Sequence, residues 1–119
     1  MPSVVCYKGD NNYETAVGRA AYKAAKETGN TLIFDIKRLL GKLPNDPKVN
    51  NLKPDWPFEI GTDDAERIRI KRNASGADDL YGEELSAIVL EKMKSIAELE
   101  ANATVSKAVV TVPAYFTKA

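Results

Sequence analysis

The feature that most constrains the fold of this chain is an apolar stripe between residues 82 and 101. Apolar side chains recur there at spacings of three and four residues, which is the period of an amphipathic α-helix. Glu83 and Glu84 fall in the first turn, where the helix dipole favours anions, and Asn102 is a suitable stop. We therefore predict one long helix over residues 82–101. Its apolar stripe is formed by Leu85, Ile88, Val89, Met93, Ile96 and Ala97.

Residues 108–112, Ala-Val-Val-Thr-Val, form a continuous apolar run, which is typical of a β-strand buried on both faces. Such a strand needs neighbours on each side, and the rest of the chain offers few segments to cover it. Strand-like sequence also begins almost at Met1, so we expect the chain to be a fragment of a larger domain. On its own, the fragment should either pair between chains through this run or have a disordered C-terminus.

The N-terminal third predicts a β-hairpin followed by a helix. Residues 3–7 and 13–17 are β-rich and flank turn-forming residues at 8–12, so they indicate two antiparallel strands. Residues 18–28 are rich in alanine, the best helix former, and Gly29 is a natural stop.

The middle of the chain predicts shorter elements. Residues 34–40 indicate a short helix ended by Gly41, and the prolines that follow prevent a long continuation. Residues 57–61 and 65–72 indicate an antiparallel hairpin, because the second segment alternates polar and apolar side chains. Residues 73–79 are polar and rich in Gly and Ala, which indicates a loop. Together these elements predict a domain of the α/β or α+β class.

Composition narrows the chemistry that such a fold can perform. Lys and Arg number 17, as do Asp and Glu, and the resulting net charge of zero argues against binding to nucleic acid or an anionic membrane. The absence of histidine excludes Ser-His-Asp and Cys-His catalysis, and the single cysteine excludes an intrachain disulfide. No apolar run is long enough to span a membrane. Carboxylates, lysines, hydroxyls and backbone amides remain as reactive groups.

Two charged clusters are candidate sites. Lys37 and Arg38 lie on the short helix, where an ammonium could stabilise negative charge on a phosphate; alternatively, both are solvated helix residues. The basic strand at 67–72 could contact nucleic acid, but it lacks interleaved aromatic residues, and a solvated sheet face is the simpler interpretation. The glycines form none of the phosphate-binding loop motifs.

Three further features have structural interpretations. Cys6 lies in a strand and has no histidine to activate it, so we expect a small buried side chain. Trp56 stands between two prolines and is expected to anchor a loop by packing. The acidic pair Asp63-Asp64 lacks the alternating ligands of a calcium loop, so capping of a turn is the better interpretation.

Two motifs in this sequence are distinctive, namely F-D-x-K-R-L-x-G at residues 34–41 and V-x-V-P-A-Y-F at residues 110–116. Residues 2–5, 56–58 and 83–94 belong to the same pattern. Taken in chain order and with their separations, these segments and the two motifs resemble the ATPase domain of the 70-kDa heat-shock protein family, the DnaK-type chaperones. The resemblance covers essentially the whole chain.

The resemblance implies a fold and two site residues. The fold is part of lobe I of an actin-like (ribonuclease H-like) ATPase domain, so residues 1–119 are a partial nucleotide-binding domain. Residues from about 5 to 106 resemble subdomain IB, and residues from about 107 to 119 resemble a strand and helix start of subdomain IA. Lys37 matches the family's catalytic lysine, which lies near the γ-phosphate and helps to position the attacking water. Pro113 matches the proline proposed as a conformational switch.

The resemblance also implies a function for the parent protein. The parent would be an ATP-dependent chaperone that binds ATP or ADP with Mg²⁺ and couples hydrolysis to binding and release of unfolded polypeptides. Its partners would be polypeptide clients, J-domain co-chaperones and nucleotide-exchange factors, without nucleic acid or membrane. The location would be cytoplasmic, with the endoplasmic reticulum left open. A partner contact at Trp56 and the basic strand 67–72 is a further hypothesis.

Other motifs of the family are not found in this chain. Its two phosphate loops, its catalytic glutamate and its adenosine pocket would lie before Pro2 and after Ala119. We therefore expect the isolated fragment to be inactive and to bind no nucleotide cofactor and no metal. The alternative is a non-catalytic interaction module, or an exchange-factor-like relative of the same family. The presence of Lys37 favours the catalytic parent.

Overall fold

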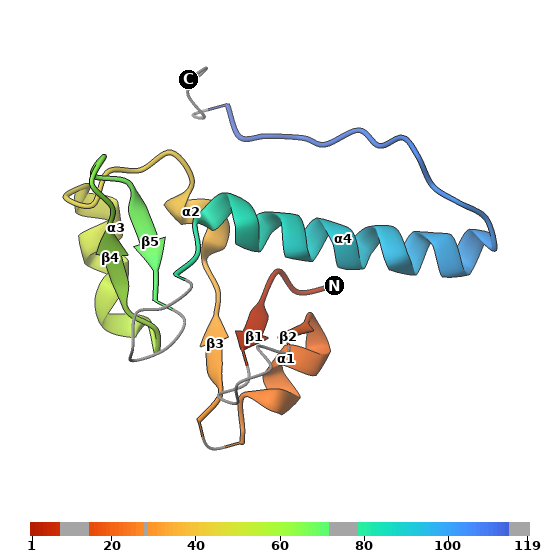
Figure 1. Cartoon of the computed structure of the whole chain (residues 1–119), viewed down its shortest axis with the longest axis horizontal. Helices are drawn as coiled ribbons and strands as arrows, with labels where there is room; N and C mark the ends of the chain where they lie inside the picture. Colours follow the sequence, from red (N-terminus) through yellow and green to blue (C-terminus); the bar gives the residue numbers. More distant parts are fainter. Residues whose placement is uncertain (8–14, 28, 72–78, 115–119) are drawn as a thin grey trace.

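The computed structural model describes residues 1–7, 15–27, 29–71 and 79–114. Two small antiparallel sheets lie beside one end of a long helix, and the C-terminal segment runs back above that helix (Figure 1). Mixed helices and antiparallel sheets confirm the prediction of an α+β fragment. Within the part of the chain that the structure describes, no helix is long and apolar enough to cross a membrane.

The first sheet contains the predicted N-terminal hairpin. β1 (Val5–Tyr7) pairs antiparallel with β2 (Thr15–Val17), and Val5 lies opposite Val17. A third strand, β3 (Thr31–Ile33), pairs with the other edge of β1 and was not predicted from the sequence. The strand order is therefore β2-β1-β3. α1 (Arg19–Ala24) follows β2 and is shorter than the helix predicted over residues 18–28.

The second sheet is the hairpin predicted in the middle of the chain. β4 (Ile60–Thr62) pairs antiparallel with β5 (Ile68–Ile70), so the prediction is confirmed with shorter strands. A single bridge joins Ile70 to Leu80, which brings the start of the long helix next to this hairpin. The loop predicted at 73–79 lies almost entirely outside the described residues.

Two short helices follow β3 in the sequence and precede β4. α2 (Ile36–Leu39) is the predicted short helix, and Gly41 follows it with a φ of 70°. α3 (Pro47–Leu52) leads into a 3-10 turn, η1 (Lys53–Asp55), and neither was predicted. The prolines after Gly41 prevent α2 from continuing, but Pro47 occupies the first turn of α3, where its missing N–H is tolerated. The Asp46 side chain caps α3 by accepting a 2.8 Å hydrogen bond from the backbone N–H of Lys48.

The long helix, α4 (Gly82–Ala101), has the predicted bounds, and Asn102 ends it in the left-handed conformation with a φ of 49°. The N-terminal half packs against α2 closely enough that a Cβ on Gly82 would lie 3.1 Å from Leu40 Cδ2. Leu85 and Val89 are buried, whereas Met93 and Ile96 are exposed. Only the first half of the predicted stripe therefore contributes to the core.

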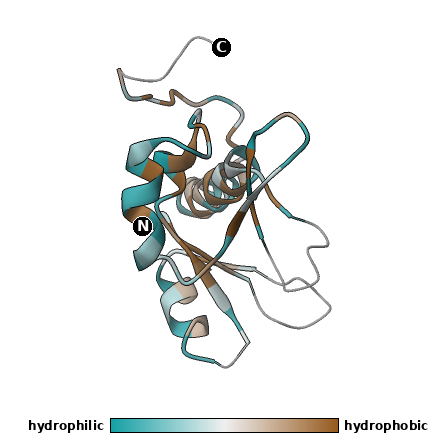
Figure 2. Ribbon diagram, turned by 90° about the vertical axis from the view of Figure 1, so that its left-hand side faces the viewer, coloured by the Kyte–Doolittle hydropathy of each residue, from teal (hydrophilic) through white to brown (hydrophobic). Residues whose placement is uncertain are grey.

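The main core joins both sheets to α2, α3 and the beginning of α4. Figure 2, in which α4 is seen along its axis, shows apolar strand segments around that helix. Thirteen buried residues form this cluster: Val5, Tyr7, Ile33, Ile36, Leu39, Val49, Trp56, Phe58, Ile68, Ile70, Leu80, Leu85 and Val89. A smaller cluster under α1 contains Cys6 at zero exposure, which confirms the interpretation of this cysteine as a small buried side chain.

Residues 108–112, whose sequence predicts a strand that needs neighbours on each side, form no strand in this chain. Residues 103–113 form no helix or strand, and Val109, Val110 and Val112 are 96%, 60% and 65% exposed. A strand requires hydrogen-bonded neighbours, and none of the strands in the described residues pairs with this segment. The intrinsic β-preference of the run therefore does not suffice to make it a strand here.

Candidate functional site

The candidate site is built around α2, which carries Lys37. Ile36 and Leu39 are each 4% exposed and fix the helix to the core through one face. Lys37 and Arg38 lie between them in the sequence and are exposed, as the 3.6-residue period of a helix requires. The packing of two apolar residues therefore decides where the Lys37 ammonium can reach.

The turn into α2 is held by a contact that the sequence did not predict. Asp35 has a φ of 59° and a ψ of 24°, a left-handed conformation that is costly for a residue other than glycine. Its Oδ2 accepts a 3.1 Å hydrogen bond from Nε1 of Trp56, and its Oδ1 lies 3.8 Å from Nε of Arg38. These contacts offset the strain and fix the orientation of the residues that follow.

An aromatic cluster supports the same turn. The Trp56 ring stacks on Phe58 with centroids 5.0 Å apart, and Phe58 meets Phe34 edge to face at 5.9 Å. Trp56 is 8% exposed, which confirms its interpretation as a packing anchor. Phe34 directly precedes Asp35, so the cluster restrains the chain just before the strained residue, and Trp56 bonds to that residue itself.

Lys37 and Pro113, which are 76 positions apart in the sequence, line the same pocket. This pocket has a volume of about 670 Å³. Lys37 reaches it from α2, and Pro113 reaches it from the C-terminal segment. The remaining lining residues are Ser3, Val4, Tyr22, Phe34, Asp35, Ile36, Arg38, Thr111 and Val112. The tertiary structure thus brings together the two positions that the family resemblance had singled out.

The chemistry of this pocket suits an anionic oxygen-rich ligand. Lys37 and Arg38 supply two positive charges against the carboxylate of Asp35, and Ser3 and Thr111 supply hydroxyl groups. Phosphate oxygens are bound by cations and hydroxyl donors of this kind. The described residues contain no group of three His, Cys, Asp or Glu side chains that could hold a metal ion.

The basic strand predicted as a second candidate is β5 with its flanks. Each of its three described cations lies within 4.0 Å of a carboxylate, so the strand presents little unpaired positive charge. This pairing favours the interpretation as a solvated sheet face over a nucleic-acid contact. Arg72 lies outside the described residues. The three pairs are Arg67–Asp63 at 2.9 Å, Arg69–Asp79 at 4.0 Å and Lys71–Glu59 at 3.9 Å.

Asp63 joins the β4–β5 turn to the beginning of α4. Its Oδ1 accepts backbone hydrogen bonds from Ala65 and Arg67, which confirms the predicted turn-capping role. Its Oδ2 accepts a 2.7 Å bond from the Tyr81 hydroxyl, and the Arg67 guanidinium lies 4.7 Å from the Tyr81 ring centre. The hydrogen bond from Tyr81, followed by that from the Arg67 backbone, lowers the pKa of Asp63 from 3.8 to about 2. The bond to Asp63 raises the pKa of the Tyr81 hydroxyl.

Comparison with known proteins agrees with the resemblance in the sequence. The sequence model of the family described as "Hsp70 protein" matches residues 1–119, which is the whole chain. A heat shock protein of Pyricularia oryzae is 38% identical over 116 residues, covering 97% of this chain and 18% of the relative.

Two further relatives show the same pattern. A ribosome-associated molecular chaperone of Saccharomyces cerevisiae is 36% identical over 118 residues, covering 99% of this chain and 19% of its own length. A heat shock cognate protein of Trypanosoma brucei brucei is 40% identical over 117 residues, covering 97% and 17% respectively. The chain therefore spans less than a fifth of the length of the curated relatives it matches.

Proposed function

Since this chain belongs to the Hsp70 protein family, we propose that it forms part of an ATP-dependent molecular chaperone. The parent protein would couple ATP hydrolysis to the binding and release of unfolded polypeptides. The observation that supports this proposal most directly is the pocket shared by Lys37 and Pro113. In the same proposal, residues from about 5 to 106 form a subdomain IB and the segment from about 107 belongs to subdomain IA.

Lys37 has the chemistry that phosphoryl transfer requires. Its ammonium is a compact point charge, and α2 presents it at the pocket from a turn fixed by Trp56. ATP would supply the transferred phosphoryl group, with Mg²⁺ as counter-ion, and negative charge would develop on the phosphate oxygens. A cation held in place beforehand stabilises that charge without reorganisation during the reaction. Pro113 would couple the same pocket to the C-terminal segment.

The role of Lys37 can be tested in the full-length protein that contains this sequence. Lys37→Ala should slow single-turnover ATP hydrolysis by roughly 10²–10³-fold, because it removes one electrostatic donor from the transition state. Nucleotide affinity should change little, since phosphate binding depends mainly on backbone loops. Lys26→Ala, which removes an exposed lysine from another surface, is the matched control. Turnover of Lys37→Ala at the wild-type rate would refute the assignment.

A second measurement concerns residues 1–119 alone. We propose that this segment binds ATP very weakly or not at all, because its sequence contains none of the glycine-rich phosphate loops. Titration calorimetry of the isolated chain with MgATP should show no saturation in the micromolar range. A sub-micromolar dissociation constant would contradict this part of the proposal.

The partners and location of the parent follow from the same proposal. Unfolded polypeptides, J-domain co-chaperones and nucleotide-exchange factors would bind the parent, and the location would be cytoplasmic. Several relatives are named as ribosome-associated chaperones, which supports a cytoplasmic site of action. If the full-length protein bound polypeptide clients without hydrolysing ATP, the non-catalytic alternative would replace this function.

A further inference from the structure

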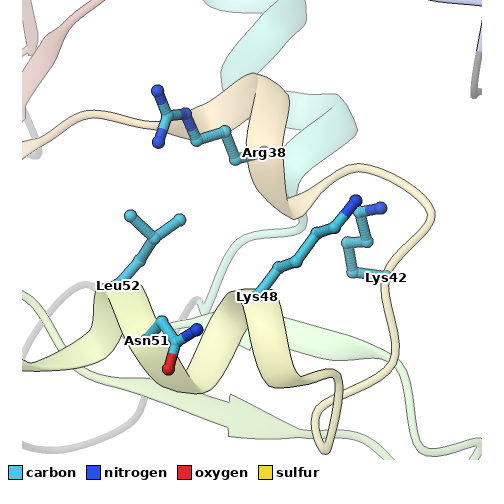
Figure 3. A pocket seen from close by; sticks show the side chains of 5 residues that line it. All are labelled: Arg38, Lys42, Lys48, Asn51 and Leu52. Atoms are coloured by element: carbon cyan, nitrogen blue, oxygen red, sulfur yellow. The ribbon is translucent and has the colours of Figure 1, made fainter.

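A second pocket, of about 360 Å³, lies between α2 and α3. It is lined by Arg38, Lys42, Lys48, Asn51 and Leu52. Arg38 belongs to α2, Lys42 to the connection that follows it, and the other three to α3. Figure 3 shows Lys48 extending from α3 towards α2 on the side where Lys42 lies, with Leu52 facing the gap below Arg38. Three segments of the chain therefore place cations around one opening.

The electrostatic character of this pocket is one-sided. Three of its five lining side chains are cationic and none is acidic. Arg38 has one carboxylate nearby, at 3.8 Å from Asp35, but its side chain is 62% exposed, so most of its N–H donors remain accessible. Within the described residues, no carboxylate lies within ion-pair distance of the Lys48 ammonium. Arg38 and Lys48 therefore bring positive charge to this opening, with the carboxylates of Asp35 and Asp46 nearby, on a chain with a net charge of zero.

We propose that this pocket binds a carboxylate-rich peptide segment of a protein partner. The Arg38 guanidinium can donate two parallel N–H bonds to one carboxylate, and the Lys48 ammonium can neutralise another. The Asn51 amide can bond to a peptide group, and Leu52 offers an apolar contact for a side chain between the acids. Lys37 does not line this pocket, but Arg38 lines both pockets, so the proposal is tested at Lys48, which does not line the pocket that holds Lys37.

Charge distribution favours an acidic peptide over a larger polyanion. Nucleic acids and anionic membranes are bound by broad basic surfaces on chains with excess positive charge. Here the cations line one small pocket, and the described cations of β5 are already paired with carboxylates. A few carboxylates at short spacing match the size of this pocket. An extended phosphate backbone would reach well beyond it.

The proposal can be tested by fluorescence anisotropy with the chain of 119 residues. The probe is a fluorescein-labelled hexapeptide, Asp-Glu-Leu-Glu-Glu-Asp, and its amide counterpart, Asn-Gln-Leu-Gln-Gln-Asn, is the control peptide. We expect saturable binding of the acidic probe that weakens with added salt, and no binding of the amide peptide. Lys48→Glu should weaken the affinity by about tenfold, because it replaces an attraction with a repulsion.

The variant has suitable controls for folding and for net charge. Lys48 lies in the first turn of α3, where the helix dipole favours an acidic residue, so Lys48→Glu should leave the thermal midpoint unchanged. Lys26→Glu makes the same charge change at an exposed position away from the pocket and should leave binding intact. Lys48→Arg should also keep the affinity for the acidic peptide.

Three results would overturn the proposal. Two of them are equal binding of both peptides and a loss of affinity in Lys26→Glu equal to that in Lys48→Glu. Tighter binding of single-stranded RNA or phosphatidylserine vesicles would overturn it as well.

Discussion

The left-handed residue before α2 shows how one side chain can determine the geometry of a site. Asp35 accepts a hydrogen bond from buried Trp56, and the two residues are 21 positions apart. Asp is tolerated in this conformation better than most residues, and the bond from Trp56 adds a long-range contact to the local one with Arg38. The motif at residues 34–41 singled out Lys37 as a candidate, whereas nothing in the local sequence pointed to the bond between Asp35 and Trp56.

The first prediction concerns the bond between these two residues. Trp56→Phe keeps an aromatic ring against Phe58 but removes the indole N–H, so the free energy of unfolding should fall by about 1–2 kcal/mol. Trp56→Ala should cost about 3–5 kcal/mol, because it also empties the core position. Trp56 is the only tryptophan, so unfolding in urea should be followed by far-UV circular dichroism.

A double-mutant cycle isolates the hydrogen bond from the packing. Trp56→Phe and Asp35→Ala together should destabilise the protein by about 1 kcal/mol less than the sum of the single changes. Asp35→Gly relieves the backbone strain while it removes the same acceptor, and it provides the control for conformation. Strict additivity of Trp56→Phe and Asp35→Ala would show that the bond contributes nothing.

The second prediction concerns pH. The pKa of Asp63 is about 2 in the folded chain, below its ordinary value of 3.8, so ionised Asp63 stabilises the folded state. This contribution is fully present above pH 3.8 and is lost as the pH falls towards 2. In Asp63→Asn, which keeps an acceptor oxygen for the turn, the stability should depend less steeply on pH in this window. Urea denaturation of both proteins at several pH values between about 2 and 5 measures the difference.

The Tyr81 hydroxyl makes the largest contribution to this pKa. Tyr81→Phe should therefore return the pKa of Asp63 towards its ordinary value, which carboxyl-carbon NMR titration can measure. Retention of a pKa near 2 in Tyr81→Phe would assign the effect to the donors of Arg67 and Ala65 instead.

At the scale of elements, α4 has the bounds that the sequence predicts, but only the first half of its apolar face is buried. Leu85 has zero exposure, whereas Leu99 is 80% exposed on the same helix.

The third prediction follows from this contrast between Leu85 and Leu99. Leu85→Ala should lower the free energy of unfolding by about 2–5 kcal/mol through loss of core packing. Leu99→Ala should change it by less than about 0.5 kcal/mol. Equal effects in chemical denaturation would show that the second half of α4 is also packed.

The elements that were missed share a physical cause. β3 has only three residues and becomes a strand because β1 offers it an edge, with Val5 opposite Ile33. α3 begins at Pro47, and its cap at Asp46 was not recognised as a start signal. Such short elements contain too few residues for periodicity to reveal them, since tertiary contacts supply most of their stability.

At the scale of the whole molecule, the described C-terminal segment remains outside the core. Val109, Val110 and Val112 are exposed, and the second half of α4 is exposed as well. An unpaired β-prone run with little charge is a template for pairing with another chain. The fourth prediction is that the isolated chain self-associates in a concentration-dependent manner in sedimentation velocity experiments.

Variants in the same segment test whether strand pairing through the exposed valines causes the self-association. Val110→Lys should shift the isolated chain towards the monomer, because a charge opposes strand pairing. Thr104→Lys, at an exposed polar position of this segment, should leave the association unchanged. A wild-type chain that stays monomeric at all concentrations would contradict the prediction.

The sequence by itself determined the long helix, the two hairpins and the family, and its resemblance to that family singled out Lys37 and Pro113 as candidate site residues. These features rest on local periodicity, turn residues and short motifs, which involve only residues that are close together in the sequence. Only the tertiary structure decided that Asp35 depends on Trp56, that Lys37 and Pro113 line one pocket, and that three cations surround another. It also decided that residues 108–112 form no strand in this chain. The physical reason is that a pocket, a long-range hydrogen bond and a β-ladder each need a partner from a distant part of the chain.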